Sequence, residues 1–230
     1  MEFFVDIADI GKVERVLEYY PVDGITTNPN ILAKSPSDDI PGLIEQYRRL
    51  SDERGLTLFF QVTAETAEDM LAQAKTLRAY FGERLIVKLP AVEQGYKALL
   101  LCGRAGIPTA LTMVHSVMQA LVAAKAGAAY VAPYVSHIDN IGADGIREVA
   151  DMVKVFREGG YPCKVLGASF RTVDQVERLA LVGCHAVTLT PEFFPMLIAH
   201  PSTNESAAQF KSAWESRFGG SQVTDLLPKA

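Results

Sequence analysis

The chain has 230 residues, of which 49% are hydrophobic, and a formal net charge of −5. This length is enough for one well-buried core and too short for two full-sized domains, so we expect a single domain spanning residues 1–230. Lys and Arg are scattered and form no basic stripe, which argues against nucleic acid as a partner and favours a small-molecule substrate.

The first residues, Met1 to Asp6, lack the basic and long apolar segments of a secretory signal, and no stretch approaches the roughly 18 apolar residues of a membrane span. We therefore expect a cytoplasmic protein with no membrane partner. The cysteines Cys102, Cys163 and Cys184 lie far apart in apolar or glycine-containing segments, which is typical of reduced, buried thiols rather than of disulfides or zinc ligands.

Short apolar runs rich in β-branched residues recur along the chain, and a segment with helical spacing follows each of them. The expected strands are Phe3–Ile7, Gly24–Thr27, Thr57–Val62, Leu85–Leu89, Pro108–Thr112, Tyr130–Pro133, Lys164–Ala168 and Ala186–Leu189. Eight strand–helix units without a glycine-rich nucleotide-binding turn predict a (β/α)8 TIM barrel rather than an open doubly wound sheet.

Helix start signals mark where several of these strands give way to helices. They are Thr66, the capping box Thr172 to Gln175, and Thr190 followed by Pro191 at the expected first helical position. After the eighth unit, residues 203–218 predict an additional C-terminal helix with Phe210, Trp214 and Phe218 on one face. That aromatic face needs a surface to cover, either the chain's own barrel or a neighbouring subunit.

In a barrel of this kind the site lies at the carboxyl ends of the strands, so the polar residues there are the candidates for function. In chain order these are Asp6, Thr26, Thr27, Asn28, Gln61, Lys88, Thr112, Tyr134, Ser169 and Arg171. Thr188 and Thr190 at the end of the eighth strand are interpreted as a helix cap rather than as part of the chemistry.

Lys88 is the most informative of these residues, because it places an ammonium group inside an otherwise apolar strand. Desolvation lowers the pKa of a buried lysine from about 10.4 toward the range in which the neutral amine is a nucleophile. The alternative is that Lys88 reaches solvent or pairs with Asp6. Lys164 lies at the opposite, amino-terminal end of its strand, where charged residues usually serve stability.

Each of the other candidates also has an ordinary structural alternative. Asp6 could cap the following helix, and Asn28 could be a turn residue before proline. Gln61 and Thr112 could bond to one another inside the barrel, and Tyr134 could be a core tyrosine with a paired hydroxyl.

Ser169 and Arg171 precede the helix that begins near Thr172. A hydroxyl, a guanidinium and free backbone N–H groups would converge there, on the loop that commonly binds phosphate in barrels. This combination predicts a phosphate site.

With these residues in place, the sequence resembles the small-subunit transaldolase family and is most similar to its fructose-6-phosphate aldolase branch. The likeness runs through nearly the whole chain, in the segments Phe4–Asp6, Gly24–Pro29, Phe60–Val62, Ile86–Pro90, Gly106–Thr109, Tyr130–Tyr134 and Ala168–Phe170. The resemblance implies a class I aldolase, which cleaves or forms the C3–C4 bond of fructose 6-phosphate-like ketoses without a metal or an organic cofactor.

The family's roles imply that Lys88 attacks C2 of a ketose and forms a Schiff base, while Asp6 and Asn28 orient the three-carbon unit. Tyr134 acts as general acid and base, with a water held by Gln61 and Thr112, a role usually worth about 10²- to 10⁴-fold in rate. Thr27, Ser169, Arg171 and His137 complete the set expected to bind substrate.

Gln61 and Tyr134 stand where transaldolases of the family have Glu and Phe, which favours the aldolase branch. His137 departs from the family, because it replaces an Arg that helps to hold phosphate. An imidazole is a weaker and pH-dependent partner for an anion than a bidentate guanidinium.

Three alternatives remain from the sequence. A transaldolase would transfer the dihydroxyacetone unit between sugar phosphates, and a non-catalytic sugar-phosphate binding protein would need no neutral amine at a strand end. A metal-dependent aldolase is disfavoured, because His115 and His137 have no ligand-like spacing. The resemblance also implies a homo-oligomer, commonly a decamer in which the C-terminal helix covers a neighbour.

Overall fold

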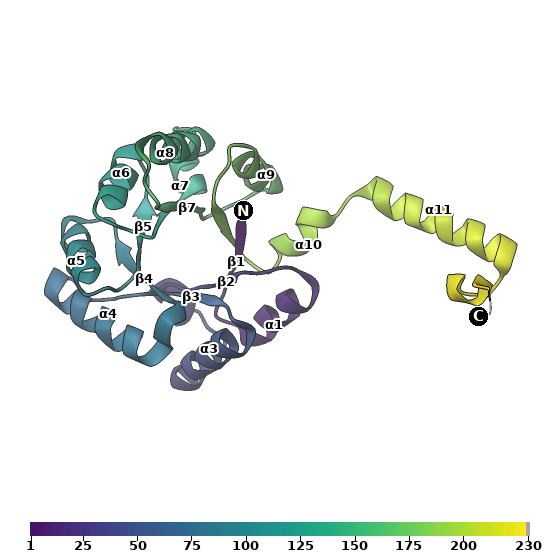
Figure 1. The fold of residues 1–230 in the computed structure, drawn as a ribbon, viewed down its shortest axis with the longest axis horizontal. Helices are drawn as coiled ribbons and strands as arrows, with labels where there is room; N and C mark the ends of the chain where they lie inside the picture. The colour runs from purple at the N-terminus through teal and green to yellow at the C-terminus, as the bar shows by residue number, and fades with distance from the viewer. Residues whose placement is uncertain (229–230) are drawn as a thin grey trace. The chain divides into compact units, whose positions relative to one another are not determined.

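The computed structural model describes residues 1–228 and contains a closed barrel of eight parallel strands, each paired with the next and β8 with β1. The strands are β1 (Glu2–Asp6), β2 (Gly24–Thr26), β3 (Thr57–Gln61), β4 (Leu85–Pro90), β5 (Thr109–Val114), β6 (Tyr130–Pro133), β7 (Lys164–Gly167) and β8 (Ala186–Leu189). Figure 1 shows the helices around this barrel. The expected (β/α)8 architecture is confirmed.

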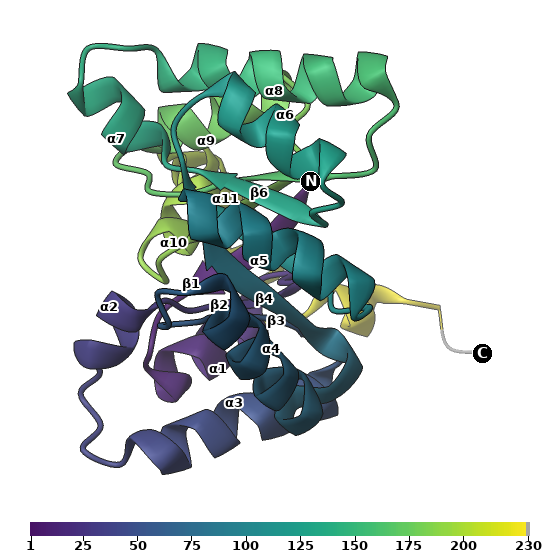
Figure 2. The ribbon, with the colours of Figure 1, turned by 90° about the vertical axis from the view of Figure 1, so that its left-hand side faces the viewer.

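The described helices alternate with the strands and are α1 (Ile10–Tyr19), α2 (Pro29–Ala33), α3 (Ile40–Arg54), α4 (Ala67–Phe81), α5 (Glu93–Arg104), α6 (Val117–Lys125), α7 (Val135–Asn140), α8 (Gly145–Gly159), α9 (Val173–Leu181), α10 (Phe193–Ile198) and α11 (Pro201–Phe218). Figure 2 shows α4 and α5 side by side on the outside of β3 and β4. Within the described residues, no helix is both long enough and apolar enough to cross a membrane.

The strand boundaries lie within two residues of those expected from the sequence. The helix starts at Thr66 and Thr172 are confirmed, and the side chains of Thr172 and Gln175 form the reciprocal capping box. The expected helix start at Pro191 is wrong. Thr190 to Glu192 form a turn in which the Phe193 N–H donates to the Thr190 carbonyl, so α10 begins two residues later.

The middle of the barrel is filled by apolar side chains from alternate positions of the strands. Phe4, Phe59 and Tyr130 pack edge to face, with ring centroids 5.0 Å (Phe4–Phe59), 5.1 Å (Phe59–Tyr130) and 6.4 Å (Phe4–Tyr130) apart. Such aromatic contacts add about 0.5–1.5 kcal/mol each beyond the area that they bury. The next inward-facing residues, two positions further along each strand, pack directly above this layer.

The amino-terminal end of the barrel is closed by a polar cluster. The Lys164 ammonium contacts the Glu2 carboxylate at 2.7 Å, and the Tyr130 hydroxyl donates to the same carboxylate at 3.0 Å. Lys164 therefore has a structural contact at this end, as its position in the strand indicates. The three cysteines are buried and free, as expected.

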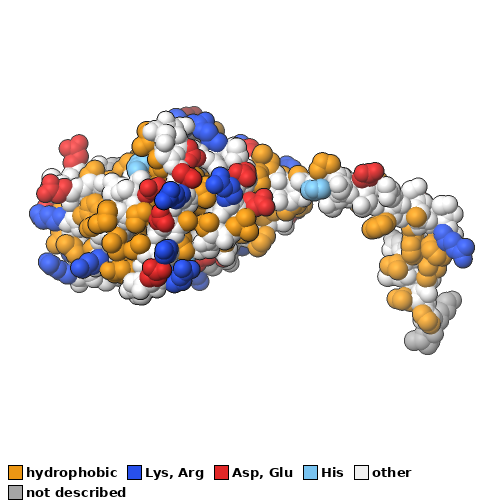
Figure 3. Space-filling model, turned by 90° about the horizontal axis from the view of Figure 1, so that it is seen from above, with side chains coloured by type: hydrophobic (Ala, Val, Ile, Leu, Met, Phe, Trp, Pro, Cys, Tyr) orange, Lys and Arg blue, Asp and Glu red, His pale blue; other side chains and the backbone are white. Residues whose placement is uncertain are grey.

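The described residues divide into two compact units, Met1–Phe194 and the residues from Pro195 on. In the second unit, α11 begins two residues before the expected start at 203, because His200 caps it and Pro201 occupies the first turn. Trp214 and Phe218 stack with their ring centroids 4.5 Å apart, and Phe210 is 74% exposed. Hydrophobic side chains gather toward the end of this unit (Figure 3), and their docking on a neighbouring subunit stays a prediction.

Gly24 has a packing role that a substitution can test. A Cβ at this position would lie 2.0 Å from the Thr57 carbonyl oxygen and 3.0 Å from the Phe4 ring. We expect Gly24→Ala to lower the free energy of unfolding by about 1–3 kcal/mol, because the overlap involves backbone of the paired strand. The measurement is urea unfolding followed by circular dichroism.

Gly103→Ala is the matched control, because a Cβ there meets nothing within 4 Å in the last turn of α5. This substitution is expected to raise stability by about 0.4–1 kcal/mol through the unfolded chain. Equal unfolding midpoints for the two variants would show that close strand packing does not require Gly24.

Candidate active site

A cavity of about 510 Å³ opens at the carboxyl ends of the strands. Of the ten residues to which the sequence and the family resemblance assign a catalytic or binding role, eight line this cavity: Asp6, Asn28, Gln61, Lys88, Thr112, Tyr134, His137 and Ser169. These residues come from seven strands or the segments that follow them, so closure of the barrel is what brings them together.

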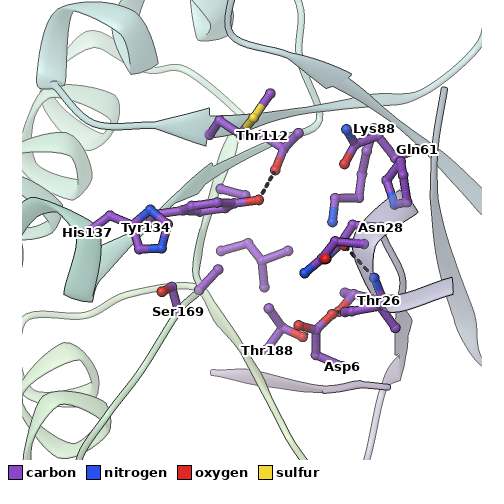
Figure 4. Close-up of a pocket in the computed structure, with 17 residues that line it drawn as sticks. Asp6, Thr26, Asn28, Gln61, Lys88, Thr112, Tyr134, His137, Ser169 and Thr188 are labelled. Atoms are coloured by element: carbon purple, nitrogen blue, oxygen red, sulfur yellow. Dashed lines mark hydrogen bonds between the residues drawn. The ribbon is translucent and has the colours of Figure 1, made fainter. Parts of the chain in front are cut away.

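The lining has two sides that face one another across the cavity (Figure 4). We call Asp6, Thr26, Asn28, Gln61 and Lys88 the lysine side, which comes from β1 to β4. We call Tyr134, His137 and Ser169 the histidine side, which comes from the residue after β6, from α7 and from the loop after β7.

Strand alternation explains why these side chains point inward. Successive side chains of a strand face opposite sides of a sheet, so residues two apart share one side. Asp6 follows the core residue Phe4, Gln61 follows Phe59, and Lys88 lies opposite Gln61 in the register of β3 with β4. The cavity floor is therefore the next inward layer above the aromatic core.

Lys88 is buried, with only 6% of its surface exposed, and its ammonium nitrogen donates to the Thr27 carbonyl oxygen at 2.8 Å. Burial lowers the pKa of this amine, while the negative charge of Asp6 acts in the opposite direction. Among the described residues, Lys88 and Asp6 form no ion pair within 4.0 Å. The amine is thus desolvated without being fixed as one half of a salt bridge.

Asp6 is held by hydroxyl groups rather than by a cation in direct contact. The Thr26 hydroxyl donates to Asp6 Oδ1 at 2.6 Å, and Thr26 and Thr188 share a hydrogen bond of 2.6 Å. Burial raises the pKa of Asp6, and Lys88 and Thr26 lower it. The cap of α1 is Asp9, whose carboxylate accepts from the Lys12 N–H, so Asp6 is free of the capping role that its position allowed.

Asn28 has a structural contact and also faces the cavity. Its side-chain oxygen accepts from the Ile31 N–H at 2.9 Å and caps α2, and its side chain also lines the cavity. Because the oxygen is committed to the cap, the amide is oriented and its NH2 group remains as a donor toward a substrate.

Thr112 and Tyr134 share a hydrogen bond of 3.1 Å between their hydroxyl groups. The pKa of Tyr134 is raised, chiefly by burial and also by the charge of Asp6, while the bond from Thr112 opposes the shift. Tyr134 is therefore protonated near neutral pH and able to donate. The expected alternative bond between Gln61 and Thr112 does not form in the described residues, and Gln61 faces the cavity.

His137 belongs to a small aromatic cluster at the histidine side. Its ring packs edge to face on Tyr134 with centroids 5.2 Å apart and stacks on His115 at 6.1 Å. The Tyr134 ring thus packs against His137 and its hydroxyl shares a hydrogen bond with Thr112, and these two contacts hold the side chain at the cavity wall.

Two non-glycine residues with a left-handed backbone, Ser169 (φ 62°) and Met113 (φ 61°), both line this cavity. Such a conformation costs of order 1–3 kcal/mol and persists where surrounding structure imposes it, often at functional sites. At Met113 the register of β5 with β6 shifts between Thr112 and Val114. At Ser169 the carbonyl accepts from the Ser136 N–H at 2.9 Å.

Two expected substrate-binding residues lie elsewhere. The Thr27 hydroxyl donates to the Phe59 carbonyl at 3.1 Å, so Thr27 contributes its backbone carbonyl to Lys88 rather than its side chain to the cavity. Arg171 is exposed and does not line the cavity. The N–H groups of Arg171 and Thr172 are also occupied, because both donate to Gln175 Oε1. The expectation that Arg171 and the N–H groups of this helix start face the ligand is therefore wrong, and of the residues expected to bind phosphate only Ser169 and His137 line the cavity.

Thr26, a strand-end candidate to which the sequence assigned no role, lines the cavity, and Thr188 does so although the sequence did not point to it. Thr188 was interpreted as a cap, yet it lines the cavity and completes the hydroxyl chain to Asp6. The available signal was strand alternation, since Thr188 lies two residues after Ala186 of the inward core layer.

Comparison with known proteins identifies the chain. The transaldolase/fructose-6-phosphate aldolase family matches residues 3–227. The chain belongs to this family. A relative described as a probable transaldolase, from Anaeromyxobacter sp. (strain Fw109-5), is 35% identical over 217 residues, which cover 94% of this chain and 98% of that protein. Membership in the transaldolase/fructose-6-phosphate aldolase family makes the chain an enzyme with aldolase or transaldolase activity.

Solved structures support the fold alone. A structure described as native KDPGal matches with a TM-score of 0.57 and 14% identity over 94% of this chain and 95% of that chain. A mandelate oxidase mutant with an FMN adduct matches with a TM-score of 0.54 and 17% identity over 83% of this chain and 64% of that chain.

The protonation of Lys88 can be measured directly by reductive methylation with formaldehyde and cyanoborohydride, followed by peptide mass spectrometry at a series of pH values. We expect the labelling midpoint of Lys88 below the ordinary lysine value of 10.5, because burial disfavours its charged form. Lys164 is the internal control, and its midpoint is expected above 10.5 because Glu2 stabilises its charge. Asp6→Asn should move the Lys88 midpoint further down. A Lys88 midpoint at or above that of Lys164 contradicts the assignment.

Proposed function

We propose that this enzyme is a class I aldolase that cleaves fructose 6-phosphate-like ketoses into dihydroxyacetone and glyceraldehyde 3-phosphate through a Schiff base on Lys88. The observation that carries the proposal is the buried amine of Lys88 at the cavity wall, with its pKa lowered by desolvation. A buried lysine without a direct ion pair destabilises the fold, and its use as a nucleophile accounts for its presence.

The first half of the reaction forms the imine. The neutral amine of Lys88 attacks the C2 carbonyl of the ketose, and loss of water from the carbinolamine leaves a protonated imine. Asp6 and the NH2 group of Asn28 lie on the same side as Lys88 and are placed to orient the hydroxyl groups of the three-carbon unit. The 510 Å³ cavity has room for such a sugar phosphate.

The second half breaks the carbon–carbon bond. A base takes the proton of the C4 hydroxyl, the C3–C4 electron pair moves into the imine, and the aldehyde leaves an enamine on Lys88. Protonation of the enamine at C3 and hydrolysis of the imine by water then release dihydroxyacetone and restore the amine. Tyr134, held by Thr112 and facing Lys88 across the cavity, is the proposed acid and base, with a water held by Gln61.

Transaldolase activity is the second candidate, and the name of the Anaeromyxobacter relative favours it. The two activities share the enamine and differ in its fate, which is protonation and release or transfer to an acceptor aldehyde. Tyr134 supports release, because its hydroxyl can deliver a proton to the enamine whereas the phenyl ring that transaldolases of the family carry there cannot.

Schiff-base formation is tested by incubating the protein with fructose 6-phosphate or dihydroxyacetone, reducing with borohydride and weighing the intact chain. We expect a three-carbon adduct on the wild type and none on Lys88→Met. Lys164→Met is the matched control, since it removes the other lysine of a barrel strand whose contact is structural, and it should still be trapped. If neither the wild type nor the control gains mass, a sugar-phosphate binding protein becomes the better explanation.

The choice between aldolase and transaldolase is tested with Tyr134→Phe, which removes the proposed acid while keeping the ring against His137. We expect release of free dihydroxyacetone from fructose 6-phosphate to fall by about 10²-fold or more, while the borohydride adduct persists. Transfer to erythrose 4-phosphate should rise relative to release. Tyr161→Phe, outside the cavity lining, is the control, and an equal loss in both variants would remove Tyr134 from the mechanism.

A further inference from the structure

Gln175 joins two segments that carry the histidine side of the cavity. Its Oε1 accepts from the N–H groups of Arg171 (2.8 Å) and Thr172 (3.3 Å) in the loop after β7. Its Nε2 donates to Asp139 Oδ2 of α7 at 2.7 Å. The amide is also 3.4 Å from the Ser136 hydroxyl of α7 through both of its atoms, so one side chain binds the Ser169 loop through Oε1 and reaches the His137 helix most closely through Nε2.

The Asp139 end of this bridge is itself anchored. Asp139 Oδ1 accepts from the Gly145 N–H at 2.8 Å, which ties α7 to the start of α8. The backbone adds a parallel link, because the Ser136 N–H donates to the Ser169 carbonyl at 2.9 Å. His137 follows Ser136 directly, so the separation of His137 and Ser169 depends on how α7 is docked on the loop.

Side-chain amides hold other loops at this end of the barrel as well. Gln73, Gln94 and Gln119 each use Oε1 to accept from a backbone N–H group, at Thr63, Ala67 and His115 respectively. Gln73 is the nearest match to Gln175, because its Oε1 also accepts from a second N–H, that of Ala64. The difference is that Gln73 Nε2 returns to Thr63 of the same loop, whereas Gln175 reaches a second element.

We propose that Gln175 is a positioning residue that, through Asp139, sets the spacing of His137 and Ser169 and thereby the affinity for the phosphate end of the aldehyde acceptor. This inference rests on the proposed aldolase function and adds the control of acceptor recognition. The lysine side comes from β1 to β4 and has no contact with the bridge among the described hydrogen bonds, so donor binding is independent of it.

The spacing matters because few groups remain for an anion on the histidine side. The helix-start N–H groups of Arg171 and Thr172 are already used by Gln175, and the Arg171 side chain lies outside the lining. A phosphate is left with the Ser169 hydroxyl and the His137 imidazole. Two single hydrogen-bonding groups on different segments bind one anion only if the segments are held at a fixed separation.

Gln175→Glu separates this role from helix capping. Glu is an ordinary residue at this position of a capping box and keeps the acceptor oxygen for Arg171 and Thr172, but it has no donor for Asp139. We expect the KM for glyceraldehyde 3-phosphate in the synthesis direction to rise by about tenfold, which corresponds to one hydrogen bond to a charged group. The KM for dihydroxyacetone and its borohydride trapping should stay at the wild-type level.

Two further variants exclude simple charge repulsion. Gln175→Met breaks the bridge without adding charge, and it should raise the same KM. The double variant Gln175→Glu with Asp139→Asn reverses the donor and the acceptor of the bridge while keeping an oxygen for Gly145, and it should restore the KM. Gln73→Glu is the matched control and should leave the KM for glyceraldehyde 3-phosphate unchanged.

The outcomes separate this inference from the proposed function. A wild type that forms no adduct with dihydroxyacetone overturns the aldolase proposal itself. A trapped wild type overturns the positioning role if Gln175→Met keeps its KM for glyceraldehyde 3-phosphate, if unphosphorylated glyceraldehyde loses affinity to the same extent, or if the double variant shows no recovery. Thermal unfolding of each variant confirms that the chain being assayed is folded.

Discussion

Closure of a parallel sheet with a side-chain period of two is the constraint on which this structure depends. Because each strand sends alternate side chains inward, the barrel interior is built in layers. Aromatic side chains fill the middle layer, a Lys164–Glu2 pair closes the amino-terminal end, and the layer at the carboxyl ends holds Lys88 and Asp6. The cavity therefore lies directly above the packed aromatic layer of the core.

That position determines the electrostatics of the cavity. Water is excluded below by the packed rings, so Lys88 and Asp6 each lose solvation, and the pKa values of the amine and the carboxyl group move toward one another. Neither group is locked in a direct ion pair, because hydroxyl groups hold Asp6 and a backbone carbonyl holds Lys88. The pair retains the freedom to change protonation state.

Much of this arrangement follows from the sequence, because strand periodicity and strand-end polarity are local signals. Lys88 stands out among apolar neighbours, and the eight strands are recovered to within two residues. The errors come from side-chain direction and from competition for hydrogen bonds. Nothing local shows that Thr27 turns toward the Phe59 carbonyl, or that Gln175 occupies the N–H groups expected to bind phosphate. Thr188 was missed because a strand-end threonine fits a cap equally well.

The glutamines that hold the loops at the mouth of the barrel have an electrostatic consequence for ligand entry. A carboxylate could accept hydrogen bonds from the same backbone N–H groups as the amides of Gln73, Gln94, Gln119 and Gln175. Each such replacement of Gln by Glu would, however, add a negative charge to a chain whose net charge is already −5. Neutral amides order the loops without that charge. An incoming anion therefore meets a weaker repulsive potential at the entrance than the acidic composition of the chain implies, which favours its rate of capture.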